Sequence, residues 1–440
     1  MNQLTNLATQ IEQAFQQVLH TDADTLARQT GFIQRQRKLT GADFAQILLT
    51  TVLENPLPTC TDWAQTAALL GTPITPQGVD QRFTQEAAHF LQALLNRFVE
   101  QVITICTPAS APLLQRFEGV YIKDSTVISL PEALASVWQG VGGSAGARAA
   151  VKLQVRWNYS TGQLDGPALQ PARCHDRTTP YGIEDLPAGS LELADLGYFC
   201  LEELSAQHAR GQYFIRRYKV RVAVYTLDGE PLDLLGWLSQ VETVGECRVL
   251  LGQAERVPVR LIAYRVSEER ARRQRQRLYG YARRKGGTPT RKALALANWV
   301  VLVTNVPEER LRAEEVWVLA RVRWQVEILF RVWKRHARID AWRSGNVWRI
   351  LCELDAKLMG VVVLHWLLLV ARGGVWDRSV FKAARVLQKL SVLLAVDWRF
   401  GRGLAGVVLL FGEGLRSCRV NKRRRRPATF QLLLGQGGLN

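Results

Sequence analysis

Two apolar strand patterns that each run into an aspartate constrain the fold of this chain most strongly. The first, Phe117 to Ile122 (FEGVYI), leads into Asp124, and the second, Leu191 to Ala194 (LELA), leads directly into Asp195. Open α/β sheets bind their ligands at the carboxyl ends of their strands. We therefore expect a carboxylate at the end of each strand, although a single aspartate in such a place is more often a turn or helix-cap residue.

The neighbouring residues favour an α/β fold. The second aspartate is followed by a Gly turn, a helical pattern over Leu201 to Arg210 and a strand pattern over Tyr213 to Tyr218. This is the order of a βαβ unit. Further along the chain, strand patterns run over Val220 to Tyr225, Val257 to Val266 and Trp299 to Thr304. Between the two aspartates, Val151 to Tyr159 alternates as a strand, and Ser160-Thr161-Gly162 predicts a hairpin turn.

A third carboxylate lies in the helical stretch Leu319 to Arg338 (LARVRWQVEILFRVWKRHAR). At 3.6 residues per turn, Arg323, Glu327 and Lys334 fall within about 40° of one another on one helix face. An Arg323 to Glu327 pair on a solvated face is the simpler interpretation, and it would contribute only a few tenths of a kcal/mol. The two aspartates at strand ends favour a functional role for Glu327 instead.

Three such carboxylates suit a two-metal phosphoryl-transfer site. Mg²⁺ prefers carboxylate oxygen, and two ions roughly 4 Å apart activate the attacking oxygen and stabilise the leaving one. We expect Asp124, Asp195 and Glu327 to be the catalytic metal ligands of two Mg²⁺ ions, with Mn²⁺ as a substitute. The sequence has no His/Cys ligand spacing typical of zinc. Arg323 and Lys334 would hold DNA phosphate oxygens.

The charge balance indicates a polyanionic partner, nucleic acid first. Lys+Arg number 57 and Asp+Glu 39, a net charge of +18, spread over several separate segments. The Arg-rich helical stretch Glu268 to Lys285 is either a solvated helix or a phosphate-tracking arm, with Arg272 and Arg273 as candidate DNA-binding residues. Lys422 to Arg426 (KRRRR) is either a phosphate-binding tail or a solubilising terminus.

Cysteine usage and hydropathy indicate the compartment. Seven scattered cysteines with no CxxC pair argue for reducing conditions and against both disulfides and a zinc site. The N-terminal residues lack a signal-peptide pattern. The longest apolar run, Gly360 to Val370, is too short to span a bilayer and predicts a core helix. We expect a cytoplasmic, nucleoid-associated protein with no membrane contact.

Residues 1 to about 105 have helical patterns throughout. Thr61 to Leu70, a turn at Gly71 and Thr75 to Phe83 are compatible with a helix-turn-helix in which Thr75 caps the second helix and Pro76 begins it. An ordinary helical hairpin is the equally weighted alternative. The polar side chains that a DNA-reading helix would present are Gln77, Asp80, Gln81 and Arg82.

At these residues the chain resembles a known family. Arg323, Glu327 and Lys334, within RVRWQVEILFRVWK, are similar to the R-x3-E-x6-K part of the YREK signature of DDE insertion-sequence transposases, the group called insertion sequence family four. Asp124 in KDST resembles the first catalytic Asp of that family, and Asp195 in DLGYF resembles the second. The resemblance runs from about residue 117 to 345.

The resemblance implies an RNase H-like catalytic core that is interrupted by a mostly β insertion. It departs from the signature at one position, because Ala320 stands where the family has its phosphate-holding Tyr. In related enzymes an insertion Trp stacks on a flipped base, which makes Trp299 and Trp237 candidates, although core packing is the more usual role of such residues. The expected regions are a helical DNA-binding domain at 1–110, the first part of the core at 111–218, the insertion at 219–306, the catalytic helix at 307–345, and a helical C-terminal region with a basic tail and possible dimerisation at 346–440.

The implied activity is cut-and-paste transposition. A homodimer would bind the terminal inverted repeats of its element as double-stranded DNA, cleave one strand at each end and transfer the freed 3′-OH to target DNA. Two alternatives stay open. One is a transposase-derived DNA-binding protein with weakened catalysis, suggested by Ala320, and the other is an RNase H-like DNA nuclease that acts on branched DNA.

Overall fold

The computed structural model describes residues 2–35, 38–101, 103, 111–142, 147–369, 377–420 and 427–435. The chain forms two compact units. Unit 1 comprises Met1–Ser110, Ser125–Cys174 and Trp324–Arg424, and unit 2 comprises Ala111–Asp124, His175–Arg323 and Arg425–Asn440. The basic cluster Lys422 to Arg426, expected to be a phosphate-binding or solubilising tail, lies outside the described residues.

Unit 1 is mainly helical, with a two-stranded β-hairpin. Its elements are α1 (Asn2–Gln16), the π-helix η1 (Gln17–Asp22), α2 (Ala23–Gln29), α3 (Gly41–Glu54), α4 (Cys60–Leu69), α5 (Pro76–Asp80), α6 (Gln85–Val99), the 3₁₀ turn η2 (Glu132–Leu134), β2 (Ala149–Asn158), β3 (Leu164–Pro171), α12 (Trp324–Arg335), α13 (Val347–Leu368), α14 (Val380–Arg399) and α15 (Ala405–Arg416). The strand β1 (Val120–Leu130) contributes residues to both units.

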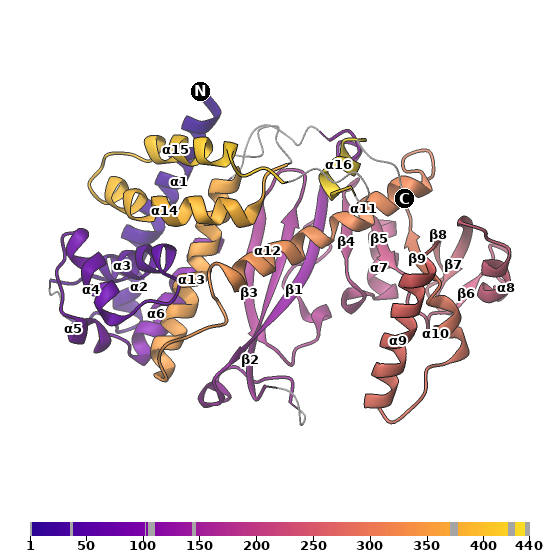
Figure 1. Ribbon diagram of the computed structural model, residues 1–440, viewed down its shortest axis with the longest axis horizontal. Helices are drawn as coiled ribbons and strands as arrows, with labels where there is room; N and C mark the ends of the chain where they lie inside the picture. Colours follow the sequence, from indigo (N-terminus) through magenta and orange to yellow (C-terminus); the bar gives the residue numbers. More distant parts are fainter. Residues whose placement is uncertain are drawn as a thin grey trace. The chain divides into compact units, whose positions relative to one another are not determined.

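The helix α13 forms the centre of the helical part of unit 1. It runs beside α3 and α6 (Figure 1), and nearly all of its residues are buried. The apolar run Gly360 to Val370, where described, is therefore a core helix, as its sequence predicted. None of the helices in the described part of the chain is long and apolar enough to cross a membrane.

Local sequence signals explain the beginnings of the N-terminal helices. Thr40 caps α3 in a capping box with Asp43, with N···O distances of 3.1 and 3.0 Å. Gly41 begins α3 where α2 passes closely, since a Cβ atom there would lie 2.3 Å from the Cβ of Ala27. A glycine at this position permits the tight packing of the two helices.

The predicted helix-turn-helix segment consists of α4 and a short α5. Thr75 accepts a hydrogen bond from the Gly78 amide at 3.1 Å, and Pro76 is the first residue of α5, which confirms both expectations. The second helix ends at Asp80 and not at Phe83. The reason is local, because Thr84 already caps α6 by accepting from the Ala87 amide at 3.3 Å.

Unit 2 contains most of the sheet. Its elements, besides the first residues of β1, are the 3₁₀ turns η3 (Asp176–Thr178) and η4 (Leu196–Tyr198), β4 (Leu191–Ala194), α7 (Leu201–Ala209), β5 (Tyr213–Arg217), β6 (Val224–Tyr225), α8 (Leu234–Ser239), β7 (Val244–Leu251), β8 (Val257–Arg265), α9 (Glu268–Arg284), α10 (Arg291–Leu296), β9 (Trp299–Thr304), α11 (Ala313–Val322) and α16 (Thr429–Leu433).

The nine strands form a sheet in the order β3-β2-β1-β4-β5-β9-β8-β7-β6. The pairs β1 with β4 and β4 with β5 are parallel, whereas β5-β9, β9-β8, β8-β7 and β7-β6 are antiparallel. The predicted hairpin of β2 and β3 is confirmed as an antiparallel pair. The mixed α/β architecture is compatible with the RNase H-like core that the sequence predicted.

Two strand predictions were wrong in their extent. The strand expected to end before Asp124 continues to Leu130, because β-branched residues at 126–128 prolong it. The strand expected over Val220 to Tyr225 is reduced to Val224–Tyr225. There the chain turns first, since the Val222 amide donates to the Lys219 carbonyl at 2.9 Å.

The region 219–306, expected to be mostly β, contains three helices beside its four strands. The helix predicted at Glu268 to Lys285 is confirmed as α9, but α8 and α10 were not predicted, and neither was β7. The buried core of this part of unit 2 joins β5, β7, β8 and β9 to α7 and α8 through residues such as Phe214, Leu238 and Leu261.

Candidate active site

Asp124 and Asp195 lie side by side on neighbouring parallel strands of unit 2. The register of β1 and β4 pairs Lys123 with Ala194, so that Asp124 is the next residue of β1 and Asp195 directly follows the end of β4. The parallel pairing ends at this point, which leaves both carboxylates at one edge of the β1-β4 pair. Asp124 is not at the end of its own strand, however, because β1 runs on for six residues. The predicted pair of carboxylates is present in register, although the strand end belongs to β4 alone.

The side chain of Asp124 is held by Arg323. One guanidinium nitrogen of Arg323 lies 2.8 Å from Oδ2 of Asp124, and the two side chains are 14% and 13% exposed. Asp195 is exposed. The sequence had paired Arg323 with Glu327 in its simpler interpretation, but this ion pair with Asp124 joins residues that are 199 positions apart in the sequence.

The helix predicted over Leu319 to Arg338 is divided in two. α11 ends at Val322 and α12 begins at Trp324, with Arg323 between them in helical backbone angles. The interruption falls on the residue whose side chain bonds Asp124. α12 ends at Arg335, before the positive φ angle of Arg338.

Glu327 and Lys334 belong to unit 1. Glu327 lies in the first turn of α12, four residues along the chain from Arg323. Lys334 donates a hydrogen bond of 3.0 Å from Nζ to the backbone carbonyl of Val127, which is part of β1. This contact holds the last turn of α12 against β1, three residues beyond Asp124.

The donor atoms of Asp124 and Asp195 are hard carboxylate oxygens, which suit Mg²⁺ or Mn²⁺. No cluster of three or more His, Cys, Asp or Glu side chains able to hold a metal ion occurs among the described residues. The three predicted ligands Asp124, Asp195 and Glu327 are therefore not gathered into such a cluster in the structure. Arg323 occupies one oxygen of Asp124, and its guanidinium places a positive charge where a cation would bind.

Directly behind the two aspartates lies a buried ion-pair network that the sequence analysis missed. Lys123 of β1 contacts Glu192 of β4 at 3.0 Å and Glu203 of α7 at 2.9 Å. Arg216 of β5 forms an ion pair with the other oxygen of Glu192, and Gln207 donates to that oxygen at 3.1 Å. Lys123, Glu192 and Arg216 are at most 1% exposed. The sequence contained one sign of this network: a charged residue interrupts the apolar pattern of each strand, namely Lys123 in β1, Glu192 in β4 and Arg216 in β5.

Burial raises the pKa of the Glu192 carboxyl, but the charges of Lys123 and Arg216 outweigh burial and lower that pKa to about 2. The carboxylate is therefore ionised throughout the physiological range. Two cations and two carboxylates balance in this network, which is the condition under which buried charges are stable.

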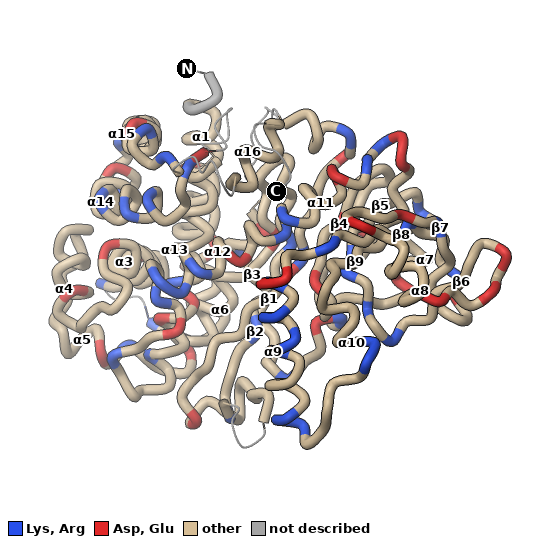
Figure 2. The backbone as a smooth tube through the Cα atoms, turned by 45° about the vertical axis from the view of Figure 1, so that its right-hand side comes forward, with Lys and Arg blue, Asp and Glu red and all other residues tan. Residues whose placement is uncertain are grey.

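The remaining predicted DNA-binding residues are dispersed. Arg272 and Arg273 lie on the exposed surface of α9, where basic residues follow one another (Figure 2), and Arg273 pairs with Glu269 at 2.6 Å. Trp299 and Trp237 are partly buried and pack against the core of unit 2. Arg82 lies in unit 1, just beyond α5 and partly exposed.

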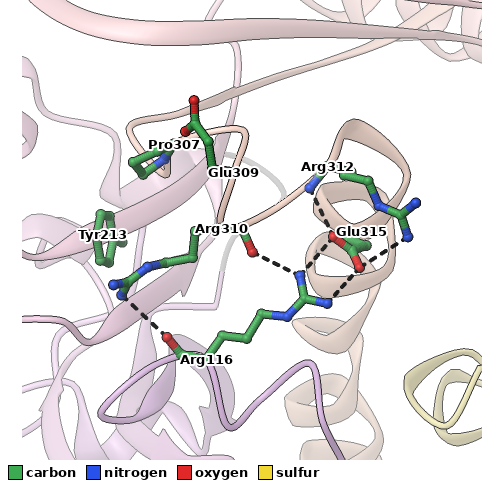
Figure 3. A pocket seen from close by; sticks show the side chains of 7 residues that line it. All are labelled: Arg116, Tyr213, Pro307, Glu309, Arg310, Arg312 and Glu315. Atoms are coloured by element: carbon green, nitrogen blue, oxygen red, sulfur yellow. Dashed lines mark hydrogen bonds and ion pairs between the residues drawn. The ribbon is translucent and has the colours of Figure 1, made fainter.

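A separate cavity of 710 Å³ lies in unit 2 and contains none of the predicted residues. Arg116 forms a bidentate ion pair with Glu315, at 2.9 Å for both nitrogens, and Arg310 lies 5.0 Å from the ring centre of Tyr213 (Figure 3). Arg116 and Arg310 also bond each other's backbone carbonyls, at 2.8 and 3.3 Å. The polar groups of Arg116, Arg310 and Glu315 are thus paired with one another. They connect the segment before β1 to the segment that leads into α11.

The comparisons with known proteins identify the family of this chain. A family model described as the transposase DDE domain matches residues 115–362. The transposase for insertion sequence element IS231F of Bacillus thuringiensis subsp. israelensis is 30% identical over 363 residues, covering 77% of this chain and 75% of the relative. The transposase for IS231C of Bacillus thuringiensis subsp. berliner is 28% identical over 455 residues, covering 96% and 94%.

A more distant relative is the transposase for insertion sequence element IS1151 of Clostridium perfringens, which is 24% identical over 371 residues and covers 78% of this chain and 76% of the relative. The family model itself spans more than half of the chain, including Asp124, Asp195, Arg323 and Glu327. This chain therefore belongs to the DDE transposase family of insertion sequences.

Proposed function

We propose that this transposase binds the terminal inverted repeats of its own element as double-stranded DNA and catalyses strand cleavage and strand transfer in cut-and-paste transposition. The observation that carries the proposal is the adjacent pair Asp124 and Asp195, in register on parallel strands with Arg323 bonded to the first. Two carboxylates and a guanidinium at the edge of a sheet are suited to phosphoryl transfer, which depends on positioning and charge stabilisation.

Each residue has a distinct role in this proposal. The DDE transposase family generally uses divalent metal ions. Asp124, Asp195 and Glu327 would hold two Mg²⁺ ions, for which Mn²⁺ would substitute, and the bound ions would supply activation of the attacking oxygen. Arg323 exchanges its bond to Asp124 for a bond to a phosphate oxygen when DNA and metal enter, so that it keeps Asp124 neutralised until substrate is present. Lys334 provides a second positive charge for the phosphate.

The proposal extends to the partners. A homodimer joins the two element ends in a synaptic complex, and target DNA is the second substrate. Exposed arginines of α9, among them Arg272 and Arg273, follow the DNA backbone through charge alone. Trp299 remains our candidate for contact with an unstacked base, and Arg82 remains a candidate DNA contact from the α4-α5 segment.

The test is strand cleavage of labelled duplexes that carry the inverted repeats flanking the gene. With Mg²⁺ or Mn²⁺, the purified protein should nick each end and join the freed 3′-OH to a target duplex. The variants Asp124→Asn, Asp195→Asn and Glu327→Gln should bind the ends but not cleave them. Asp228→Asn, at an exposed turn of unit 2, is the matched control and should cleave normally.

The outcomes separate the alternatives. Binding of the ends without cleavage by the unaltered protein would favour a catalytically weakened DNA-binding protein. Cleavage of branched DNA without strand transfer would favour a nuclease. Full cleavage by any one of the three carboxylate variants would remove that residue from the site.

A further inference from the structure

A cluster of three arginines lies at the same edge of the sheet as Asp195. The register of β4 and β5 pairs Leu193 with Ile215, so that Asp195 and Arg217 are each two residues further along neighbouring strands. Arg217, the last residue of β5, therefore lies at the same end of the parallel strands as Asp195, which directly follows β4. Arg217 is exposed.

Arg217 also shares a face of the sheet with the two aspartates. Successive side chains of a strand point to opposite faces. Lys123, Glu192 and Arg216 are joined by ion pairs on one face. The next residue of β1 and β5 therefore points to the other face, and Asp195, three residues after Glu192 in extended backbone, points there too. Asp124, Asp195 and Arg217 thus form a row across three neighbouring strands.

Two further arginines complete the cluster from the helices. Arg270 of α9 lies with its guanidinium 5.9 Å from the ring centre of Trp317 on α11, and Arg321 is one turn further along α11. Burial of part of the Arg270 side chain lowers its pKa, and the neighbouring charges of Arg217 and Arg321 lower that pKa further. Because α11 packs against β5, the strand of Arg217, the three side chains lie in one part of unit 2, and Arg217 and Arg321 both repel Arg270.

This repulsion is not compensated within the part of the protein that the structure describes. None of the three arginines forms an ion pair with a carboxylate there. The two acidic residues at the start of α9 are engaged elsewhere, Glu268 with Arg275 and Glu269 with Arg273. The Arg321 guanidinium donates to a backbone acceptor, the Pro427 carbonyl, at 3.1 Å. Three clustered cations with no carboxylate bonded to them form a site for an anion.

We propose that Arg217, Arg270 and Arg321 bind backbone phosphates of the DNA strand that reaches Asp124 and Asp195. The inference rests on the proposed function, because it takes DNA as the substrate of the aspartate pair. Guanidinium groups suit this ligand, since their planar donors match phosphate oxygens. The cluster fixes the path of the strand next to the point of cleavage, and it reads no base sequence.

The test is the salt dependence of binding to an end duplex, without divalent metal so that no cleavage occurs. Removing one arginine that binds a phosphate should reduce the slope of log K against log salt by about 0.9 and weaken binding about fivefold near 0.15 M salt. We expect this for Arg217→Gln and for Arg321→Gln, and roughly a 25-fold weakening for the double variant. Binding to an unrelated duplex should weaken by the same factors.

The matched control is Arg248→Gln, which removes an exposed arginine from β7 of the same unit. It should leave the affinity and the slope unchanged. Arg217→Lys keeps the charge and should recover most of the slope. Thermal unfolding of each variant separates a loss of binding from a loss of folding, and Arg217, being exposed, is the safest position for this comparison.

Two failures are distinguishable. If the unaltered protein binds and cleaves the ends but the Arg217 and Arg321 variants bind with its slope and affinity, the arginine site is wrong and the proposed function stands. An equal loss in Arg248→Gln would also overturn the site, because it would show a general effect of charge. If the unaltered protein binds no end DNA at low salt, the proposed function itself fails.

Discussion

The charged side chains on the two faces of the strands β1, β4 and β5 differ in burial and in ion pairing. On one face, Lys123, Glu192 and Arg216 are buried and joined by ion pairs. On the other face, Asp124, Asp195 and Arg217 occupy the adjoining positions, and Asp195 and Arg217 are exposed. The same short strands therefore carry a neutralised network on one face and the proposed metal-binding and phosphate-binding groups on the other.

The difference follows from what covers each face. α7 packs over the buried network and supplies Glu203 and Gln207 as partners. On the opposite face, α11 and the residue that follows it bring Arg321 and Arg323, both cations. The face under α7, called the covered face, gains a balanced set of charges. The face with Asp124 and Asp195, called the open face, gains an excess of positive charge. Such an excess is costly in isolation and is relieved by an anionic ligand.

The comparison is tested most strongly on the open face. In the proposed function Asp124 and Asp195 hold the metal ions, so Asp124→Asn and Asp195→Asn should lower end cleavage on the order of 100-fold or more, since a bound metal contributes several kcal/mol. Thermal unfolding of Asp195→Asn should change little because its side chain is exposed, whereas Asp124→Asn also weakens the ion pair with Arg323. Cleavage rates and melting curves of the same preparations measure both, and a variant that loses its fold together with its activity would contradict the division between the faces.

On the covered face, the largest expected effect is on folding. Glu192→Gln leaves Lys123 and Arg216 buried without their counter-charge, which typically costs about 3 to 5 kcal/mol. Denaturant unfolding should shift accordingly. Glu203→Gln is the matched control, because its side chain is 23% exposed and water replaces much of its interaction with Lys123, so we expect about 1 kcal/mol or less.

Glu192 on the covered face should also make the free energy of unfolding depend on pH. The pKa of Glu192 is about 2 in the folded chain, below its ordinary value of 4.5, so the ionised group stabilises the fold above pH 4.5 and this contribution is lost as pH falls toward 2. The loss should be about 3 kcal/mol, at 1.36 kcal/mol for each pKa unit. Between pH 6 and pH 3, the free energy of unfolding should fall more steeply in the unaltered protein than in Glu192→Gln. Equal slopes would refute the assignment of the low pKa to Glu192.

The sequence predicted the open face better than the covered one. Asp124 and Asp195 were found because a carboxylate after an apolar strand is a conspicuous pattern, and the β4, β5 and β9 strands were predicted nearly to the residue. The buried network was missed because a lone Lys or Glu within a strand is ordinarily solvent-facing. Only the register of three strands, separated by long stretches of sequence, brings the charges together.

The arginine cluster could not be predicted for a related reason. Arg217, Arg270 and Arg321 come from a strand and two helices, and no sequence spacing connects them. The Arg323 to Asp124 bond spans 199 residues and was likewise hidden, while the i,i+4 rule drew attention to Glu327. Local patterns identified which residues are chemically suited to the site, and the register of the sheet determined which of them meet.

The smallest expected effect is also the sharpest comparison, because it concerns two consecutive arginines. Arg216→Gln removes a buried partner of Glu192 and should destabilise the fold by several kcal/mol. Arg217→Gln removes an exposed side chain and should change the free energy of unfolding by no more than about 0.5 kcal/mol in either direction. It should even stabilise slightly at low salt, because it relieves the repulsion on Arg270. Denaturant unfolding of both variants at two salt concentrations measures this, and a large loss in Arg217→Gln would show that the open face is structural too.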